Sequence, residues 1–159
     1  LVGWYVQETN MDSDLAAGIG GEMTVSPDYS IKVPDKVAQP VLAKLQTLEK
    51  RNFFLDSSMT LHKLAPMLNT NSTYLSSIIR DYRGCPYNVY LKNLRMEYVT
   101  KKLREDKDWR SLTVQNLAKA CGMEDRASFT NAFVEYNKMK PAEFVRKIRQ
   151  ERADADLRK

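Results

Sequence analysis

The chain has 159 residues, a formal net charge of +5 at pH 7 and 43% hydrophobic residues. This length suits one domain with a generous tail, and the apolar content is enough for a core. No apolar run approaches the roughly 20 residues that cross a bilayer. The first residues, LVGWYVQETN, lack the basic and apolar regions of a signal peptide. Because the chain does not begin with Met, we expect a piece of a larger protein.

Charge is distributed unevenly along the chain. Residues 1–34 carry five acidic residues and one Lys, whereas residues 35–159 carry 24 basic and 15 acidic residues. The net charge therefore changes from −4 to +9. A basic body suggests a polyanionic partner. A solvated basic surface would explain the charge equally well, so charge alone does not decide between them.

Cysteine and histidine are scarce. The chain has two cysteines, Cys85 and Cys121, and one histidine, His62. This rules out an ordinary zinc spacing and a Cys/His catalytic pair. We expect both thiols to pack as small hydrophobic groups in a reducing compartment. No paired carboxylates, nucleophile elbow or phosphate-cradling Gly loop is visible, so we expect no catalytic residue, no metal and no cofactor.

The first predicted helix follows a segment without periodicity. Residues 1–34 contain several Gly and Pro and are interpreted as a linker or weakly ordered tail. A helix is predicted from about residue 35 to residue 52, with Val41, Leu42, Leu45 and Leu48 on one side. Residues 35–55 would form an N-terminal helix leading into the domain.

Two short predicted helices with a tight turn between them come next. Thr60 is a suitable N-cap for a helix over 61–68, which Pro66 should shorten or kink. Asn69 can take the left-handed conformation that ends this helix. The stretch LNTNSTYLSSIIRDYRG, residues 68–84, then has the apolar spacing of a second helix. Its inner face holds Tyr74, Leu75, Ile78, Ile79 and Tyr82, and its outer face holds Ser72, Thr73, Ser76, Ser77 and Arg80.

A long helix is predicted from Pro86 to Arg104, because Pro suits a first helical turn. Its apolar side chains are expected to pack on both halves of the domain; they include Val89, Tyr90, Leu94 and Tyr98. After a polar loop the pattern restarts: Thr113 caps a short helix that ends at Gly122, a longer helix follows, and a last helix begins at Pro141. The predicted segments are a first unit over about 60–83, the connecting helix over 86–104, a second unit over about 113–136, a final helix over about 141–150 and a tail over 151–159.

The duplicated unit predicts a helix-turn-helix, in which the second helix enters the DNA major groove. Its exposed face must hydrogen-bond to base edges, and small hydroxyls, Arg and Asn can do so. A lone pair of helices with a polar face would be expected in any small helical domain. Two copies, a basic body and a connecting helix favour DNA.

The residues also resemble a family. The stretches LHKLAPMLNTNSTYLSSIIRDYRGCPYNVYLKNLRMEYV and LTVQNLAKACGMEDRASFTNAFVEYNKMKPAEFVRKI are similar to the DNA-binding domain of AraC-type (AraC/XylS) transcription regulators, over about residues 55–150. The resemblance implies an all-α fold of seven helices, with two helix-turn-helix subdomains joined by a long linker helix, to which we add an extra N-terminal helix. It also implies two contacts in adjacent major grooves.

The resemblance assigns roles by position. The predicted base-reading residues are Thr73, Ser76, Ser77, Arg80, Arg126, Ala127, Thr130 and Asn131, and the predicted phosphate-binding residues are Asn71 and Ser72. Arg or Asn would make the strong bidentate contacts, whereas phosphate contacts position the protein without specifying sequence.

Some positions depart from the pattern. Lys138 stands where the second unit usually has Gly, which suggests that Asn137 takes the turn conformation. Ala127 and Val134 make the second outer face less polar than the first. Arg95 matches a common linker-helix arginine, for which a structural ion pair is favoured over DNA contact.

Two functions are compatible with these patterns. The first is a bacterial, cytoplasmic, sequence-specific transcription regulator, which acts as a monomer on double-stranded DNA and follows an upstream sensor. The present chain would make no membrane contact itself. This interpretation includes the cytoplasmic part of a membrane-anchored regulator. The second is a helical protein–protein interaction module. Salt dependence separates them, because neutralising phosphates makes affinity fall steeply with ionic strength.

Overall fold

The computed structural model describes residues 31–159, so most of the predicted tail over 1–34 lies outside the described residues. The described part is all-α, with seven α-helices, two short 3₁₀ helices and no strand. The N-terminal helix is one of these seven and not an addition to them. None of the helices within residues 31–159 could cross a membrane. The elements are α1 (Asp35–Lys50), η1 (Phe53–Leu55), α2 (Leu61–Met67), α3 (Ser72–Arg83), α4 (Tyr87–Glu105), η2 (Trp109–Ser111), α5 (Val114–Ala120), α6 (Arg126–Asn137) and α7 (Pro141–Leu157).

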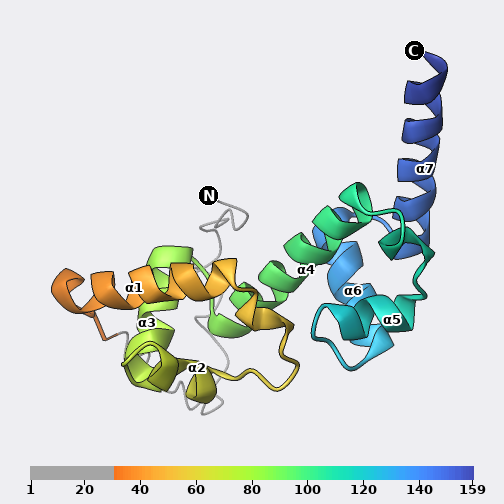
Figure 1. Ribbon diagram of the computed structural model, residues 1–159. Helices are drawn as coiled ribbons and strands as arrows, with labels where there is room; N and C mark the ends of the chain where they lie inside the picture. Colours follow the sequence, from red (N-terminus) through yellow and green to blue (C-terminus); the bar gives the residue numbers. More distant parts are fainter. Residues whose placement is uncertain (1–30) are drawn as a thin grey trace, which may run out of the picture.

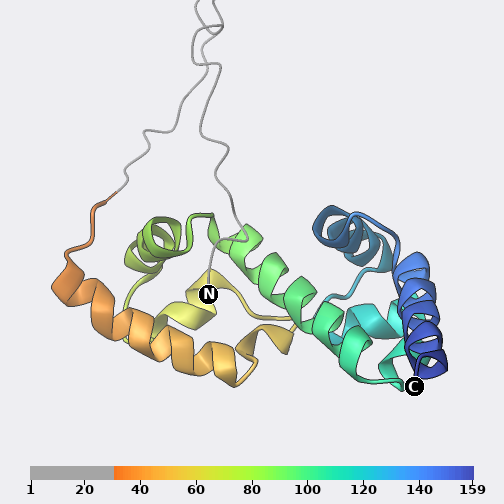
Figure 2. The same cartoon turned by 90° about the horizontal axis from the view of Figure 1, so that it is seen from above.

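The helices form two units at the two ends of α4 (Figures 1 and 2). The first unit contains α1, α2 and α3, and the second contains α5, α6 and α7. Within each unit the short helix packs on the longer helix that follows it, α2 on α3 and α5 on α6. Two helix-turn-helix arrangements are therefore present, as the duplication predicts.

Each unit has its own hydrophobic core. The first core is built around Leu45, Leu64, Leu75, Ile78 and Tyr90, all of which are fully buried. The second core is formed by apolar side chains of α4, α5, α6 and α7, with the rings of Phe129, Phe133 and Phe144 in contact; its other buried members are Met96, Val99, Leu103, Leu117, Ala118, Cys121, Ala132 and Ile148.

The first half of α4 contributes apolar side chains to one core and the second half to the other, which corrects the expectation from the sequence. Val89, Tyr90 and Leu94 pack only on the first core, whereas Met96, Val99 and Leu103 are buried in the second. At 100° per residue, Tyr90 and Leu94 lie on the side of the helix opposite Val99 and Leu103, whereas Val89 lies on the same side as Met96, two turns earlier. Tyr98 was also expected to contact both units, and its ring does contact both Phe54 and Trp109.

The two units repeat the same local stops and starts. The hydroxyls of Thr60 and Thr113 accept hydrogen bonds from the backbone N–H groups of Lys63 and Asn116, as N-caps do. The turns place Asn69 at φ 54° and Gly122 at φ 88°. Helix α2 ends at Met67, directly after Pro66, and has only seven residues. The predicted N-caps and the left-handed turn at Asn69 are confirmed.

The prediction for the end of the sixth helix is wrong. Asn137 is still helical, and Lys138 takes the left-handed conformation, with φ 61°. The side-chain amide of Asn137 donates to Thr100 Oγ1 on α4 at 3.0 Å, which holds this residue inside the helix. The left-handed residue therefore falls one position later, at the C-terminal position that Gly84 occupies after α3.

Helix α7 continues past the predicted end at residue 150, to Leu157 (Figure 1). The residues from 149 onward are exposed, so this part of the helix extends beyond the second core. The two cysteines are free and buried, as expected. Burial raises the pKa of the Cys121 thiol to about 11, which keeps it protonated and unreactive at neutral pH.

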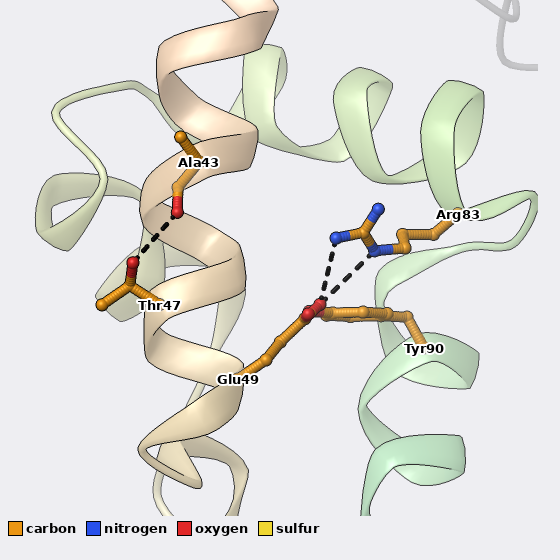
Figure 3. A network of polar contacts seen from close by, with 5 residues as sticks. All are labelled: Ala43, Thr47, Glu49, Arg83 and Tyr90. Carbon is orange, nitrogen blue, oxygen red and sulfur yellow. Dashed lines mark hydrogen bonds and ion pairs between the residues drawn. The ribbon is translucent and has the colours of Figure 1, made fainter. Parts of the chain in front are cut away.

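A polar network joins α1 to α3 and α4 (Figure 3). Tyr90 donates its hydroxyl to Glu49 Oε1 at 2.5 Å, and Arg83 contacts the same oxygen through Nη2 at 3.3 Å. Burial and the Glu49 carboxylate raise the pKa of Tyr90 far above its ordinary value, so the phenol stays protonated and acts as a donor. This network fixes α1 against the helix that presents the predicted reading surface.

The Tyr90→Phe substitution should lower the free energy of unfolding by about 1–2 kcal/mol, because it removes a partly buried hydrogen bond to a charged acceptor. Tyr87→Phe is the matched control. The Tyr87 hydroxyl is buried and forms no hydrogen bond with the described part of the chain, so its removal should not destabilise the protein. Urea unfolding of both variants measures the difference; equal effects would contradict the role given to Tyr90.

Candidate nucleic-acid interface

Helix α3 presents part of the predicted reading stripe. Thr73 and Arg80 are exposed and Ser76 is half-buried, one to two turns apart on the same helix. Thr73, Ser76 and Arg80 are spaced at i, i+3 and i+7, so they follow one face. These three side chains therefore line one accessible face of α3.

Ser77 does not belong to this surface, and its prediction is corrected. The residue is only 6% exposed. Helices α1, α2 and α4 all pack against α3, so the buried sector of α3 is wider than its stripe of large apolar side chains. A small hydroxyl fits at the edge of that sector, where it looks like part of the polar face in the sequence.

The N-terminus of α3 holds the two predicted phosphate-binding residues. Asn71 is the N-cap, and its Oδ1 accepts from the backbone N–H of Tyr74 at 2.8 Å. Ser72 Oγ lies 2.7 Å from Nδ1 of His62 on α2. This contact of His62 was not predicted from the sequence. The available signal was the position of His62 in the first turn of α2, which packs on α3.

Helix α6 presents the second predicted set. Arg126, Ala127 and Asn131 are exposed in its first two turns. Thr130 is half-buried, and its hydroxyl donates to the carbonyl of Arg126 at 2.9 Å. That bond uses the only proton of the Thr130 hydroxyl, which leaves the side chain as an acceptor toward a base.

The second helices of the two units, α3 and α6, differ in the charge at their N-termini. Helix α3 is capped by the neutral Asn71, whereas α6 is capped by Asp125, whose Oδ2 accepts from the backbone N–H and the hydroxyl of Ser128 at 2.7 and 2.6 Å. These hydrogen bonds hold the pKa of Asp125 below its ordinary value, so the cap is charged at neutral pH. A phosphate is therefore favoured at the N-terminus of α3 over that of α6.

Within residues 31–159, no group of three or more His, Cys, Asp or Glu residues is placed to hold a metal ion. The arrangement consists of two exposed helix faces with Arg, Asn and hydroxyl groups, which can form hydrogen bonds and ion pairs.

A family model described as a helix-turn-helix domain matches residues 64–147, which run from within α2 to within α7 and include α3, α4, α5 and α6. The chain belongs to the AraC-type helix-turn-helix family. Members of this family are DNA-binding transcription regulators, and their fold is not that of an enzyme.

Similar proteins come from several bacteria. The chain is 24% identical over 110 residues to the probable transcription factor PqrA of Proteus vulgaris, covering 69% of this chain and 84% of that protein. The C-terminal domain of the response regulator YesN from Fusobacterium nucleatum is 28% identical, with a TM-score of 0.55 and coverage of 64% of this chain and 93% of that one. The C-terminal domain of AraT, a response regulator from Geobacillus stearothermophilus, is 26% identical, with a TM-score of 0.57 and coverage of 67% and 84%.

Removing the charge of the second cap should strengthen binding to DNA of any sequence. Asp125→Asn keeps an oxygen that can accept from Ser128, so α6 stays capped, while one negative charge near the phosphates is lost. We expect affinity for random duplex DNA to rise roughly two- to fivefold at low salt, with the gain shrinking as salt increases. Fluorescence anisotropy at several salt concentrations measures it.

Asp125→Ala is the control for the cap itself, since it removes both the charge and the acceptor. It should lower the unfolding temperature, whereas Asp125→Asn should change it much less. An Asp125→Asn protein with unchanged DNA affinity at low salt would show that α6 does not approach the DNA backbone.

Proposed function

We propose that the chain binds double-stranded DNA sequence-specifically, by placing α3 and α6 in adjacent major grooves. The observation that carries the proposal is the repeat of one helix-turn-helix at both ends of α4, with exposed Arg and polar side chains on the second helix of each copy. In this motif the second helix enters the major groove.

The length of α4 suits two adjacent sites. Its 19 residues extend about 28 Å at about 1.5 Å per residue. Successive major-groove faces on one side of B-DNA lie about 34 Å apart. A connector of this size, together with the width of each unit, can hold both second helices toward one side of a duplex. The protein would then bind as a monomer to two short elements that need not form a palindrome.

The side chains suggest how bases are read. Arg80 on α3 and Arg126 on α6 can each donate two hydrogen bonds to guanine, and Asn131 can pair with adenine through its amide. Ala127 can meet a thymine methyl group. Thr73, Ser76 and Thr130 complete the proposed reading set, while Asn71 and Ser72 serve phosphates at the start of α3.

The similar proteins suggest where this domain acts. YesN and AraT are response regulators, and the matching part of each is its C-terminal domain. We propose that the present chain likewise follows a sensing part, which controls where or when the two units bind DNA.

Selection from a random duplex library tests the proposal. The chain should enrich fragments that share two short elements about one turn apart, and the logarithm of the affinity should fall linearly with the logarithm of the salt concentration. A protein–protein interaction module would enrich no sequence and bind duplex DNA without preference.

Substitutions then separate reading from positioning. Arg80→Ala or Asn131→Ala should cost about 1–3 kcal/mol of binding free energy at the selected site and relax the preference at one base pair. Ser72→Ala is the control on the phosphate side, and it should weaken selected and random DNA alike. Competition assays with single-base variants measure both; an equal loss on selected and random DNA for Arg80→Ala would move the reading face elsewhere.

A further inference from the structure

Residues 54–57, which run from the end of η1 into the connection to α2 and are called the η1–α2 loop below, are held from the side of α4. Arg95 on α4 donates from Nε to the carbonyl of Phe54 at 2.8 Å and from Nη2 to the carbonyl of Asp56 at 3.0 Å. The sequence suggested an ion pair for Arg95; the structure confirms a structural role, but the partners are backbone carbonyls. A guanidinium with two bonds to one loop fixes both the position and the direction of that loop.

The same loop touches the turn of the second unit. Gly122, between α5 and α6, has φ +88°, and a Cβ atom built on it would lie 2.7 Å from the carbonyl oxygen of Leu55 and 2.8 Å from that of Phe54. Both neighbours are backbone atoms, which cannot rotate away as a flexible side chain could. Gly122 is therefore required for two reasons: the left-handed turn, and the close approach of a loop from the other unit.

Two further contacts join the loop to the second unit. Leu55 packs against both hydrophobic cores, and Ser57 Oγ donates to Glu124 Oε1 at 3.4 Å. Glu124 stands directly before the cap of α6. Helix α4 therefore connects the two units, and the contact between the η1–α2 loop and the α5–α6 turn connects them a second time (Figure 1).

We propose that this inter-unit contact, made by residues 54–57 with Arg95, Gly122 and Glu124, sets the spacing and rotation of α6 relative to α3, and that Gly122 is a positioning residue for DNA reading. The inference rests on the proposed function, because it gives that function its spacing requirement. A single helix holds its two ends apart but leaves each unit able to tilt about its own packing surface. A second point of attachment away from the helix axis removes that freedom, so the two reading helices meet DNA at one separation and one phase.

The chain offers a matched pair of glycines for the test. Gly84, after α3, also has a positive φ of +76°, but a Cβ built there meets nothing within 4 Å. Gly84→Ala therefore introduces the backbone strain alone, whereas Gly122→Ala introduces strain together with a collision across the inter-unit contact. A difference between the two variants reports the contact and not the strain.

The experiment measures affinity for the selected two-element site, for the same site with one base pair added or removed between the elements, and for a duplex that carries only the first element. One base pair rotates the second element by about a tenth of a turn. For the unchanged protein and for Gly84→Ala, we expect each altered spacing to lose at least about tenfold in affinity, the value of one good base contact. The spacing ratio is the affinity for the selected site divided by the affinity for the site with altered spacing. For Gly122→Ala, we expect this ratio to fall below about threefold, with affinity for the first element alone unchanged.

A second variant covers the case in which Gly122→Ala does not fold, as judged by circular dichroism and thermal unfolding. Arg95→Gln releases the loop without backbone strain, and it should lower the spacing ratio in the same way. A spacing ratio equal to that of the unchanged protein, in either folded variant, overturns the inference. So does a loss of affinity by Gly122→Ala for the first element alone. Failure of the unchanged protein to prefer any sequence would instead overturn the proposed function.

Discussion

One helix is shared by two hydrophobic cores, and the rest of the molecule depends on that sharing. Helix α4 buries Tyr90 and Leu91 in the first core and Met96, Val99 and Leu103 in the second. Neither unit can bury its apolar face without α4, so both units must pack on this one helix. The distance between α3 and α6 is thus a consequence of core packing. The contact between the η1–α2 loop and the α5–α6 turn adds the second attachment that a rod alone lacks.

The two units share a plan but present different chemistry. Each has a Thr cap, a left-handed turn, a capped second helix and a left-handed end. Helix α3, the second helix of the first unit, carries hydroxyls and Arg80 after a neutral cap. Helix α6 carries Arg126, Asn131 and the apolar Ala127 after a negative cap. The proposed reading of two unlike elements, without a palindrome, follows from this difference.

The fold could be predicted from the sequence wherever the signal was local. The Thr60 and Thr113 caps, the turn at Asn69 and the seven-residue helix around Pro66 depend on neighbouring residues, and the structure confirms them. The predictions fail where three-dimensional packing decides. The sequence places Ser77 on the polar face of its helix, but the residue is buried, because three other helices pack against α3. The left-handed residue falls on Lys138 because Asn137 is held by Thr100, a residue from another helix.

The same limit applies to the contacts between the units. An arginine in a linker helix suggests a carboxylate partner, yet Arg95 finds two carbonyls of a loop about forty positions earlier in the chain. Gly122 could be interpreted from the sequence as a helix end. Its second requirement, room for the backbone of another unit, depends on the assembled structure.

The most direct test of the central claim is the affinity of the unchanged chain for its selected site after about five base pairs are inserted between the two elements. This insertion turns the second element to the far side of the duplex. If α4 and the inter-unit contact hold both reading helices toward one face, most of the specific affinity should be lost, leaving a value close to that for the first element alone. Unchanged affinity after the insertion would contradict the account, because it would mean that only one unit reads DNA.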